Sequence, residues 1–556
     1  MLPCLPSLDS DPSGRTQALA ASQSDLVYVW DRPLGVAMAQ SLPKRLHYSA
    51  GVVAQVAAAT VALKANSAVH RLKHGAIEST EPSSAQSATE LYCTISLPPI
   101  AHELNSAGDG DGDRAKAGQS VIADRLFAWQ RLAGCNPHVI AQVKEQSLPG
   151  GFALSAELYA SVIEGDSLAK ALTEGRLFVA DYSMLATCTA GTGRTVTAPT
   201  ALFVRPVDKT ELCPVAIRLD VSDDTVVTPL DKTRWLAARM SVQIADANVQ
   251  ESFFHLGRGH FLAEAFALAT ERQLSSRHPL YLLLSPHFDG TLPINQAARD
   301  QLIVAGGQLE ELMNPSLDSS LALVHNALTS FSYDTHELRS DLRRRGLDSK
   351  DVLPEFAYRD DAVLVCEAIE RWVQTYVSIA YSDELQVTQD TELRGWLEEL
   401  RSPNGGRLAG LPESIATRTE LARLLALIVF TTSVFHASVN YTQADFMGWT
   451  PNQPTGMYGS PQGPFASDDE AFQALLPPLA ISEKQLAFMW QQSQVRDNVL
   501  GQYPREHFQD SRVLPALERF QYDLLVAQHT IESRQARRPL PYPYLSPATL
   551  TASIHI

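Results

Sequence analysis

Near its middle the sequence reads His255-Leu256-Gly257-Arg258-Gly259-His260-Phe261-Leu262-Ala263-Glu264. The surrounding residues 248–275 are apolar on all sides, which predicts a helix buried inside a large protein. His255 and His260 are five residues apart, so a regular α-helix would turn them about 140° from each other. A single widened, π-type turn would bring both imidazoles to one side, and such turns gather at functional sites. We expect that turn here, with Gly257 and Gly259 relaxing its strained backbone.

A second apolar stretch, residues 424–439, leads into His436-Ala437-Ser438-Val439-Asn440. It is shorter than the roughly 20 apolar residues of a membrane span, and charged residues flank both of its ends. We therefore expect a second helix buried within the protein. His436 and Asn440 are four residues apart, so they share one face of that helix. Two such helices lying side by side would enclose a metal ion away from water.

Together these segments offer three imidazoles and one amide, and Ile556 adds a main-chain carboxylate. That carboxylate has a usual pKa of about 3.5, so it carries a negative charge at neutral pH. Imidazole suits iron, copper, nickel and zinc, and the absence of a thiolate from the group argues against a structural zinc or iron–sulfur centre. We expect iron, with manganese as the alternative.

Further motifs accompany these residues along the chain. They are His278-Pro279-Leu280-Tyr281-Leu282-Leu283-Leu284-Ser285-Pro286-His287, Thr291-Leu292-Pro293-Ile294-Asn295, Leu177-Phe178-Val179-Ala180-Asp181-Tyr182, Pro214-Val215-Ala216-Ile217-Arg218-Leu219, Tyr358-Arg359-Asp360-Asp361 and Leu540-Pro541-Tyr542-Pro543-Tyr544-Leu545-Ser546-Pro547. In these motifs the sequence resembles the lipoxygenases. The resemblance extends from about residue 120 to the C-terminus, which is too long a span for one shared motif to explain.

The resemblance implies a mainly α fold: a large helical catalytic domain with two long central metal-bearing helices and a small β subdomain. It implies a non-haem iron dioxygenase that inserts O2 into polyunsaturated fatty acids of the linoleic or arachidonic type, giving S-hydroperoxides. The iron ligands and catalytic residues would be His255, His260, His436, Asn440 and Ile556. The expected partners are O2 and a polyunsaturated fatty acid or its phospholipid ester, with transient contact with a membrane surface.

Other activities stay open on the same ligands. Some relatives are hydroperoxide isomerases or lyases. A lipid-acting metal hydrolase or a non-catalytic lipid-binding relic are further alternatives, although an amide and a terminal carboxylate fit a hydrolase poorly.

Glu251 and Gln443 align with a hydrogen-bonded pair that joins the metal helix to the substrate cavity in related enzymes, and such partners orient metal ligands. The alternative is that Glu251 is a carboxylate on the helix surface and that Gln443 is an ordinary amide.

The resemblance also places the substrate pocket. Leu312 and Met313 align with the floor of the fatty-acid channel, and Ala247 stands where relatives have phenylalanine. A methyl group in place of a ring deepens the channel, which favours attack nearer the middle or the carboxyl end of the acyl chain. Ala298 aligns with a position where alanine accompanies S products.

One departure from the family concerns the carboxylate of the substrate. Asp289 replaces an arginine that grips it in some relatives, and an aspartate would repel it. The fatty-acid substrate would then bind through another arginine, enter the channel in the opposite direction or be esterified in a phospholipid.

We divide the chain into an N-terminal extension of helices and loops, residues 1–120, and a catalytic domain, residues 121–556. Residues 45–72 predict an alanine- and valine-rich helix instead of the N-terminal β-barrel of many eukaryotic lipoxygenases, so the chain resembles the compact bacterial forms. Residues 77–90 and 108–113 are expected to be loops. The second lacks calcium-loop spacing, because Arg114 and Ser120 occupy the required glycine and glutamate positions. Residues 176–182 and 199–206 predict a small sheet.

Composition restricts the partners. The chain has 45 lysines and arginines against 62 acidic residues, a net charge of −17, which would repel a nucleic acid. Its six cysteines show no disulfide or metal spacing. Because the N-terminus lacks a secretory pattern, a cytoplasmic protein is the expectation.

Overall fold

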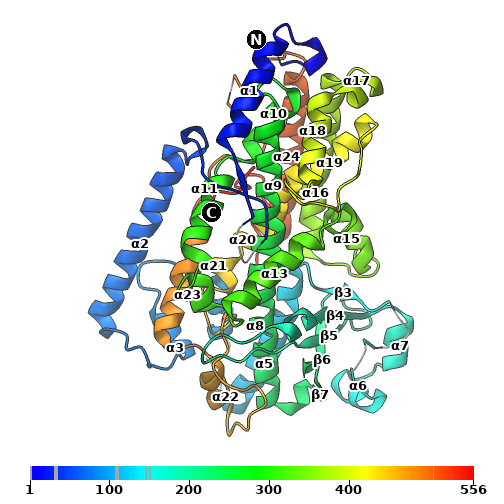
Figure 1. Cartoon of the computed structure of the whole chain (residues 1–556). Helices are drawn as coiled ribbons and strands as arrows, with labels where there is room; N and C mark the ends of the chain where they lie inside the picture. Colours follow the sequence, from blue (N-terminus) through cyan, green and yellow to red (C-terminus); the bar gives the residue numbers. More distant parts are fainter. Residues whose placement is uncertain (1–2, 31–34, 107–111, 145–147, 150–151, 505) are drawn as a thin grey trace.

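The centre of the computed structural model is a helix that runs without a break from Thr233 to Gln273 (Figure 1). The structure describes residues 3–30, 35–106, 112–144, 148–149, 152–504 and 506–556. The central helix comprises α8 (Thr233–Val249), the π-helix η5 (Gln250–Phe261) and α9 (Leu262–Gln273). The predicted widening is therefore confirmed, and it extends over 12 residues instead of a single turn.

One of the two glycines of this helix permits close packing. Neither Gly257 nor Gly259 has a positive φ. A Cβ on Gly257 would lie 2.4 Å from the Cβ of Ala327, and one on Gly259 would lie 3.8 Å from the His436 ring. Gly257 therefore lets the helix α13 (Leu317–Thr329) approach η5 closely, whereas the position of Gly259 has ordinary van der Waals room for a Cβ.

A second central helix comprises α19 (Arg418–Phe430), the π-helix η8 (Thr431–Phe435) and α20 (His436–Asn440). Of its most apolar window, 94% is buried, which confirms a core helix. Its π-turn was not predicted. The hydroxyls of Thr431, Thr432 and Ser433 donate to carbonyls of the preceding turn, and such bonds compete with the regular helix.

The remaining helices surround this pair. Next to them lie α16 (Ala357–Ala380), which packs against α19, and α24 (Leu514–Gln535), which packs against α16. The others are α10 (Pro279–Leu284), η6 (Ser285–His287), α11 (Thr291–Ala297), the π-helix η7 (Ala298–Leu302), α12 (Gln308–Leu312), α14 (Tyr333–His336), α15 (Leu338–Arg345), α17 (Glu384–Gln389), α18 (Thr391–Arg401), α21 (Gln443–Phe446), α22 (Asp468–Leu475) and α23 (Leu479–Gln492).

The predicted sheet is confirmed at one end of the molecule (Figure 1). Its antiparallel strands stand in chain order: β3 (Ala141–Gln142), β4 (Leu177–Asp181), β5 (Thr200–Val204), β6 (Cys213–Asp220) and β7 (Asp223–Val227). Along β5, Ala201 and Phe203 enter the main core, whereas Leu202 and Val204 face a second core under α6 (Ala156–Val162) and α7 (Leu168–Thr173). This alternation follows from the two-residue period of a strand. Short 3₁₀ turns η3 (Ser183–Thr187) and η4 (Pro229–Asp231) follow β4 and β7.

The N-terminal part lies over the helical body. Its elements are η1 (Pro6–Leu8), α1 (Pro12–Asp25), β1 (Tyr28–Val29), β2 (Met38–Ala39), η2 (Lys44–Leu46), α2 (Ala50–His74), α3 (Ala85–Glu90), α4 (Pro99–Ser106) and α5 (Gly112–Ala133). The helix predicted over residues 45–72 is confirmed as α2. It is also long and apolar enough to cross a membrane, and only 17% of its most apolar window is buried.

The loop predicted for residues 77–90 is wrong over its last six residues. Ser84 caps α3 through a reciprocal bond with Ser87, and Ala88 packs beside Trp449. Residues 107–111 of the second expected loop lie outside the described part of the chain, and Gly112 begins α5.

Candidate metal centre

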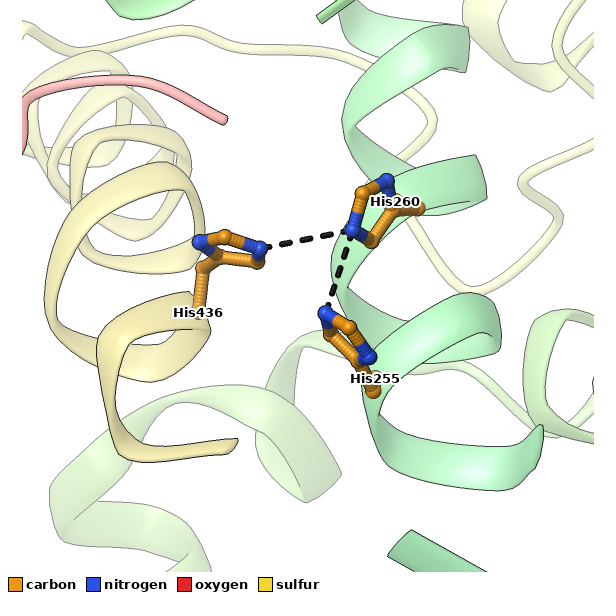
Figure 2. Close-up of side chains that lie close together, drawn as sticks. All are labelled: His255, His260 and His436. Atoms are coloured by element: carbon orange, nitrogen blue, oxygen red, sulfur yellow. Dashed lines mark hydrogen bonds between the residues drawn. The ribbon is translucent and has the colours of Figure 1, made fainter. Parts of the chain in front are cut away.

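Three imidazoles from the two central helices meet in the core (Figure 2). His255 Nε2 lies 3.2 Å from His260 Nε2, which lies 3.3 Å from His436 Nε2. All three side chains are buried. The widened η5 allows His255 and His260, which are five residues apart, to point the same way, and α20 presents His436 from the opposite side.

The outer nitrogens of two rings are held by acceptor oxygens. His255 Nδ1 lies 3.0 Å from Glu251 Oε2. His260 Nδ1 lies 2.7 Å from Asn295 Oδ1, whose assignment is supported because Asn295 Nδ2 donates to the His260 carbonyl and to Glu264. Both Nδ1 atoms therefore carry the proton, and both Nε2 atoms turn a lone pair inward.

Burial also keeps the inner nitrogens unprotonated. It lowers the pKa of His260 to about 3, and the nearby His255 ring adds to the effect. Burial, followed by the nearby His260 and His255 rings, lowers the pKa of His436 well below the usual 6.5, although a hydrogen bond with the backbone of Ile556 opposes the shift. With the proton of each ring on its outer nitrogen, the Nε2 lone pairs of His255 and His260 face each other over 3.2 Å. A cation fits this arrangement, because neutral imidazole is a common metal ligand.

The other predicted ligands lie beside this cluster. Asn440 donates its amide N–H to the Gln492 carbonyl at 2.9 Å, which leaves a buried Oδ1 without a partner among the described residues. Ile556 is buried and packs with Val52, Val495 and Ile294. An orphaned buried amide oxygen is costly unless a ligand satisfies it.

Glu251 and Gln443 form the hydrogen bond that the sequence suggested. Gln443 Nε2 donates to Glu251 Oε2 over 2.7 Å, and that oxygen is the one that meets His255. Because Gln443 belongs to α21, one carboxylate ties the central helix to the chain that follows α20.

Two residues at the centre were not predicted. Asn295 in α11 orients His260, and Glu264 in α9 accepts from Asn295 and from the Ala39 backbone. Burial raises the pKa of Glu264 to about 7. The sequence offered one signal for each residue. Asn295 is the last residue of the motif Thr291-Leu292-Pro293-Ile294-Asn295, and Glu264 is an acidic residue inside an apolar helix.

The proposed pocket residues are all buried near the two helices. Ala247 is in α8, and the side chain of the next residue, Asn248, accepts from the N–H of Asn314, the residue after Met313. Ala298 begins η7, three residues after Asn295.

Asp289 lies in a separate cleft of about 620 Å³ that Arg45 also lines. Arg45 is already paired with Glu271 in that cleft. Asp289, Asp497 and His555 have ligand atoms within 4.8 Å of one another.

Comparison with known proteins places this geometry in a family. The sequence model of the lipoxygenases matches residues 114–540. Linoleate 9/13-lipoxygenase of Pseudomonas aeruginosa is 30% identical over 640 residues, which cover 100% of this chain and 93% of that protein. Human hydroperoxide isomerase ALOXE3 is 33% identical over 448 residues, 78% of this chain and 62% of that protein.

Solved structures agree with the sequence comparison. The structure of a calcium-dependent 11R-lipoxygenase superposes with a TM-score of 0.89 at 26% identity, covering 100% of this chain and 83% of that one. The predicted helical fold with a small sheet is thereby confirmed. The chain belongs to the lipoxygenases, the dioxygenases that oxygenate polyunsaturated fatty acids.

Proposed function

We propose that this lipoxygenase is iron-dependent and converts free or esterified polyunsaturated fatty acids of the linoleic or arachidonic type into S-hydroperoxides. The observation that carries the proposal is that His255 Nε2 and His260 Nε2 lie 3.2 Å apart while the outer nitrogen of each ring faces an acceptor oxygen. A cation between the two inner nitrogens would be bound by both lone pairs at once.

The residues that would hold the iron are His255, His260, His436, Asn440 and the carboxylate of Ile556. Nitrogen and oxygen donors without a thiolate suit iron, and manganese would keep the reaction class. When bound, the metal supplies the one-electron chemistry that takes a hydrogen atom from a methylene between two cis double bonds, so that O2 can add.

The protein's own part is orientation and exclusion of water. Glu251 and Asn295 fix the ring planes and proton positions of two histidines, and such partners raise ligand basicity. The buried helices around the cluster keep bulk water from a reactive fatty-acid radical.

Three positions support the substrate assignment. Ala247 has a methyl group where relatives have a phenylalanine ring, which would leave room at a pocket floor formed with Leu312 and Met313, so the methyl end of the acyl chain would pass further beyond the metal. Ala298 supports S stereochemistry, because it aligns with a position where alanine accompanies S products in related enzymes. Asp289 disfavours a free carboxylate at its cleft, which supports binding by another arginine, entry in the opposite sense or an esterified substrate.

The exposed helix α2 supports contact with a membrane surface. Its outer face presents Val61, which is 66% exposed, and Leu72, which is 86% exposed. The helix has no acidic residue, and Lys64, Arg71 and Lys73 stand in its second half. An apolar face with basic residues binds anionic lipid surfaces.

A hydroperoxide isomerase is the second candidate, because a relative with that name is 33% identical over 78% of the chain. Oxygen uptake separates the two activities. The proposed dioxygenase consumes O2 with linoleic acid and forms a conjugated diene, whereas an isomerase converts added hydroperoxide without net O2 uptake. Chiral chromatography of the product tests the S assignment.

A further inference from the structure

A cleft of about 930 Å³ opens between α16, α19 and α24. Its lining includes none of the proposed metal ligands and none of the proposed pocket residues. Its volume lies in the range of small-molecule sites, roughly 300–1,000 Å³. The cleft is therefore large enough for a ligand of its own.

The floor of this cleft is apolar. α19 contributes Ala422, Ala426 and Phe430 at four-residue spacing, which places them on one helix face. Trp372 of α16 and Phe520 of α24 belong to the same apolar lining and stack with ring centroids 5.6 Å apart. The two alanines leave the space that larger side chains would fill.

The rim of the cleft is cationic. Only three carboxylates line it, whereas the arginines are Arg339, Arg343, Arg371, Arg423, Arg512 and Arg519. This excess occurs in a chain whose net charge is −17. A concentration of arginine beside an apolar floor attracts an anion that carries an apolar tail.

Two of these arginines are available to such an anion. Four are paired with carboxylates, for example Arg371 and Arg519 with Asp523. Within the described chain, Arg343 and Arg423 have no carboxylate within 4.0 Å, and both are exposed. The Arg423 guanidinium lies over the Tyr333 ring at 5.2 Å.

We propose that this cleft is a second lipid site that binds one long-chain fatty acid, with its acyl chain on the floor and its carboxylate at Arg343 and Arg423. A recessed cleft suits a single acyl chain better than a bilayer surface. Arginine pairs with carboxylates through charge-assisted hydrogen bonds. The inference goes beyond the proposed function, because the ligand needs no double bond and no metal.

Trp372 in the floor provides the test. A palmitate brominated at its methyl end cannot be oxygenated at a pentadiene, and its bromine quenches a tryptophan that it touches. We expect this acid to quench the full-length protein more than the Trp372→Phe variant. The R343E/R423E double variant should bind it at least about tenfold more weakly, a loss of about 1.4 kcal/mol. Ala426→Phe, which fills the floor, should abolish the Trp372 component.

R234E/R537E, the same double charge reversal at two exposed arginines outside the cleft, is the matched control and should bind normally. Circular dichroism establishes that each variant is folded. Equal quenching of the wild type and Trp372→Phe would overturn the proposal. So would equal binding of the brominated methyl ester, because the rim would then not recognise a carboxylate. Quenching of Trp372 by brominated phosphatidylglycerol vesicles but not by the free acid would assign the cleft to a phospholipid instead.

Discussion

The side-chain amide of Gln443 donates a 2.7 Å hydrogen bond to Glu251, whose carboxylate also meets His255. This relationship joins α21 to the central helix and fixes the proton of one imidazole on its outer nitrogen. The inner nitrogen is then left as a lone pair, which is the property that a metal ligand requires.

Glu251→Gln should weaken metal binding about 10- to 100-fold, because a neutral amide holds the His255 proton less strongly. Titration of the apoprotein with ferrous iron measures the affinity. Glu398→Gln, at an exposed position of α18, is the control. Unchanged affinity in Glu251→Gln would show that the carboxylate does not orient His255. Gln443→Ala leaves the Glu251–His255 contact in place and should have a smaller effect.

Ala247→Phe should move oxygenation toward the methyl end of the acyl chain, because a ring in place of a methyl group shortens the pocket above Leu312 and Met313. Chromatography of the reduced products from arachidonic acid measures the positions. The same change at Ala160, an exposed alanine of α6, is the control. An unchanged product pattern in Ala247→Phe would remove Ala247 from the pocket.

Val61→Asp should weaken binding to anionic vesicles several-fold, because it places a charge on the exposed apolar face of α2. Co-sedimentation with phosphatidylglycerol vesicles at low salt measures the bound fraction. Val207→Asp makes the same change at an exposed valine near the sheet, where 44% of the residue is accessible. If both variants bind as the wild type does, α2 is not the lipid-contacting helix.

Asp166→Asn should reduce the free energy of unfolding at neutral pH by about 1–2 kcal/mol. Hydrogen bonds from Arg176 lower the pKa of Asp166 from 3.8 to about 2. The carboxylate therefore contributes stability that is complete above about pH 4 and is lost as the pH falls toward 2. Urea unfolding of both proteins should show a difference that shrinks over this interval. Asp224→Asn, at an exposed position, should show none. A difference that is constant with pH would contradict the role of the ion pair.

The sequence predicted the parts of the fold that depend on periodicity and spacing. The five-residue interval between His255 and His260 required a widened helix, and the apolar run before His436 required a buried one. The length of the widening was not predictable, since it depends on packing between η5 and α13. Local capping at Ser84 formed α3 where composition alone suggested a loop.

The site was predictable where chemistry decides it, and less so where contacts between distant segments decide it. Three imidazoles and an amide were visible as potential ligands. Asn295 and Glu264 orient His260 through a contact between α9 and α11 that no spacing in the sequence reveals. The arginine-rimmed cleft also forms only when α16, α19 and α24 pack together.

We propose that His255, His260 and His436 together hold one iron. The direct measurement is metal content per chain, determined by mass spectrometry on the purified protein and on His260→Ala and His436→Ala, together with oxygen uptake on linoleic acid. His138→Ala, which changes a buried histidine outside the cluster, controls for loss of an imidazole. We expect about one iron per chain and oxygen uptake in the wild type and in His138→Ala, and loss of both in the two cluster variants. Wild-type protein that carries zinc and takes up no oxygen, or cluster variants that keep their iron, would contradict this proposal.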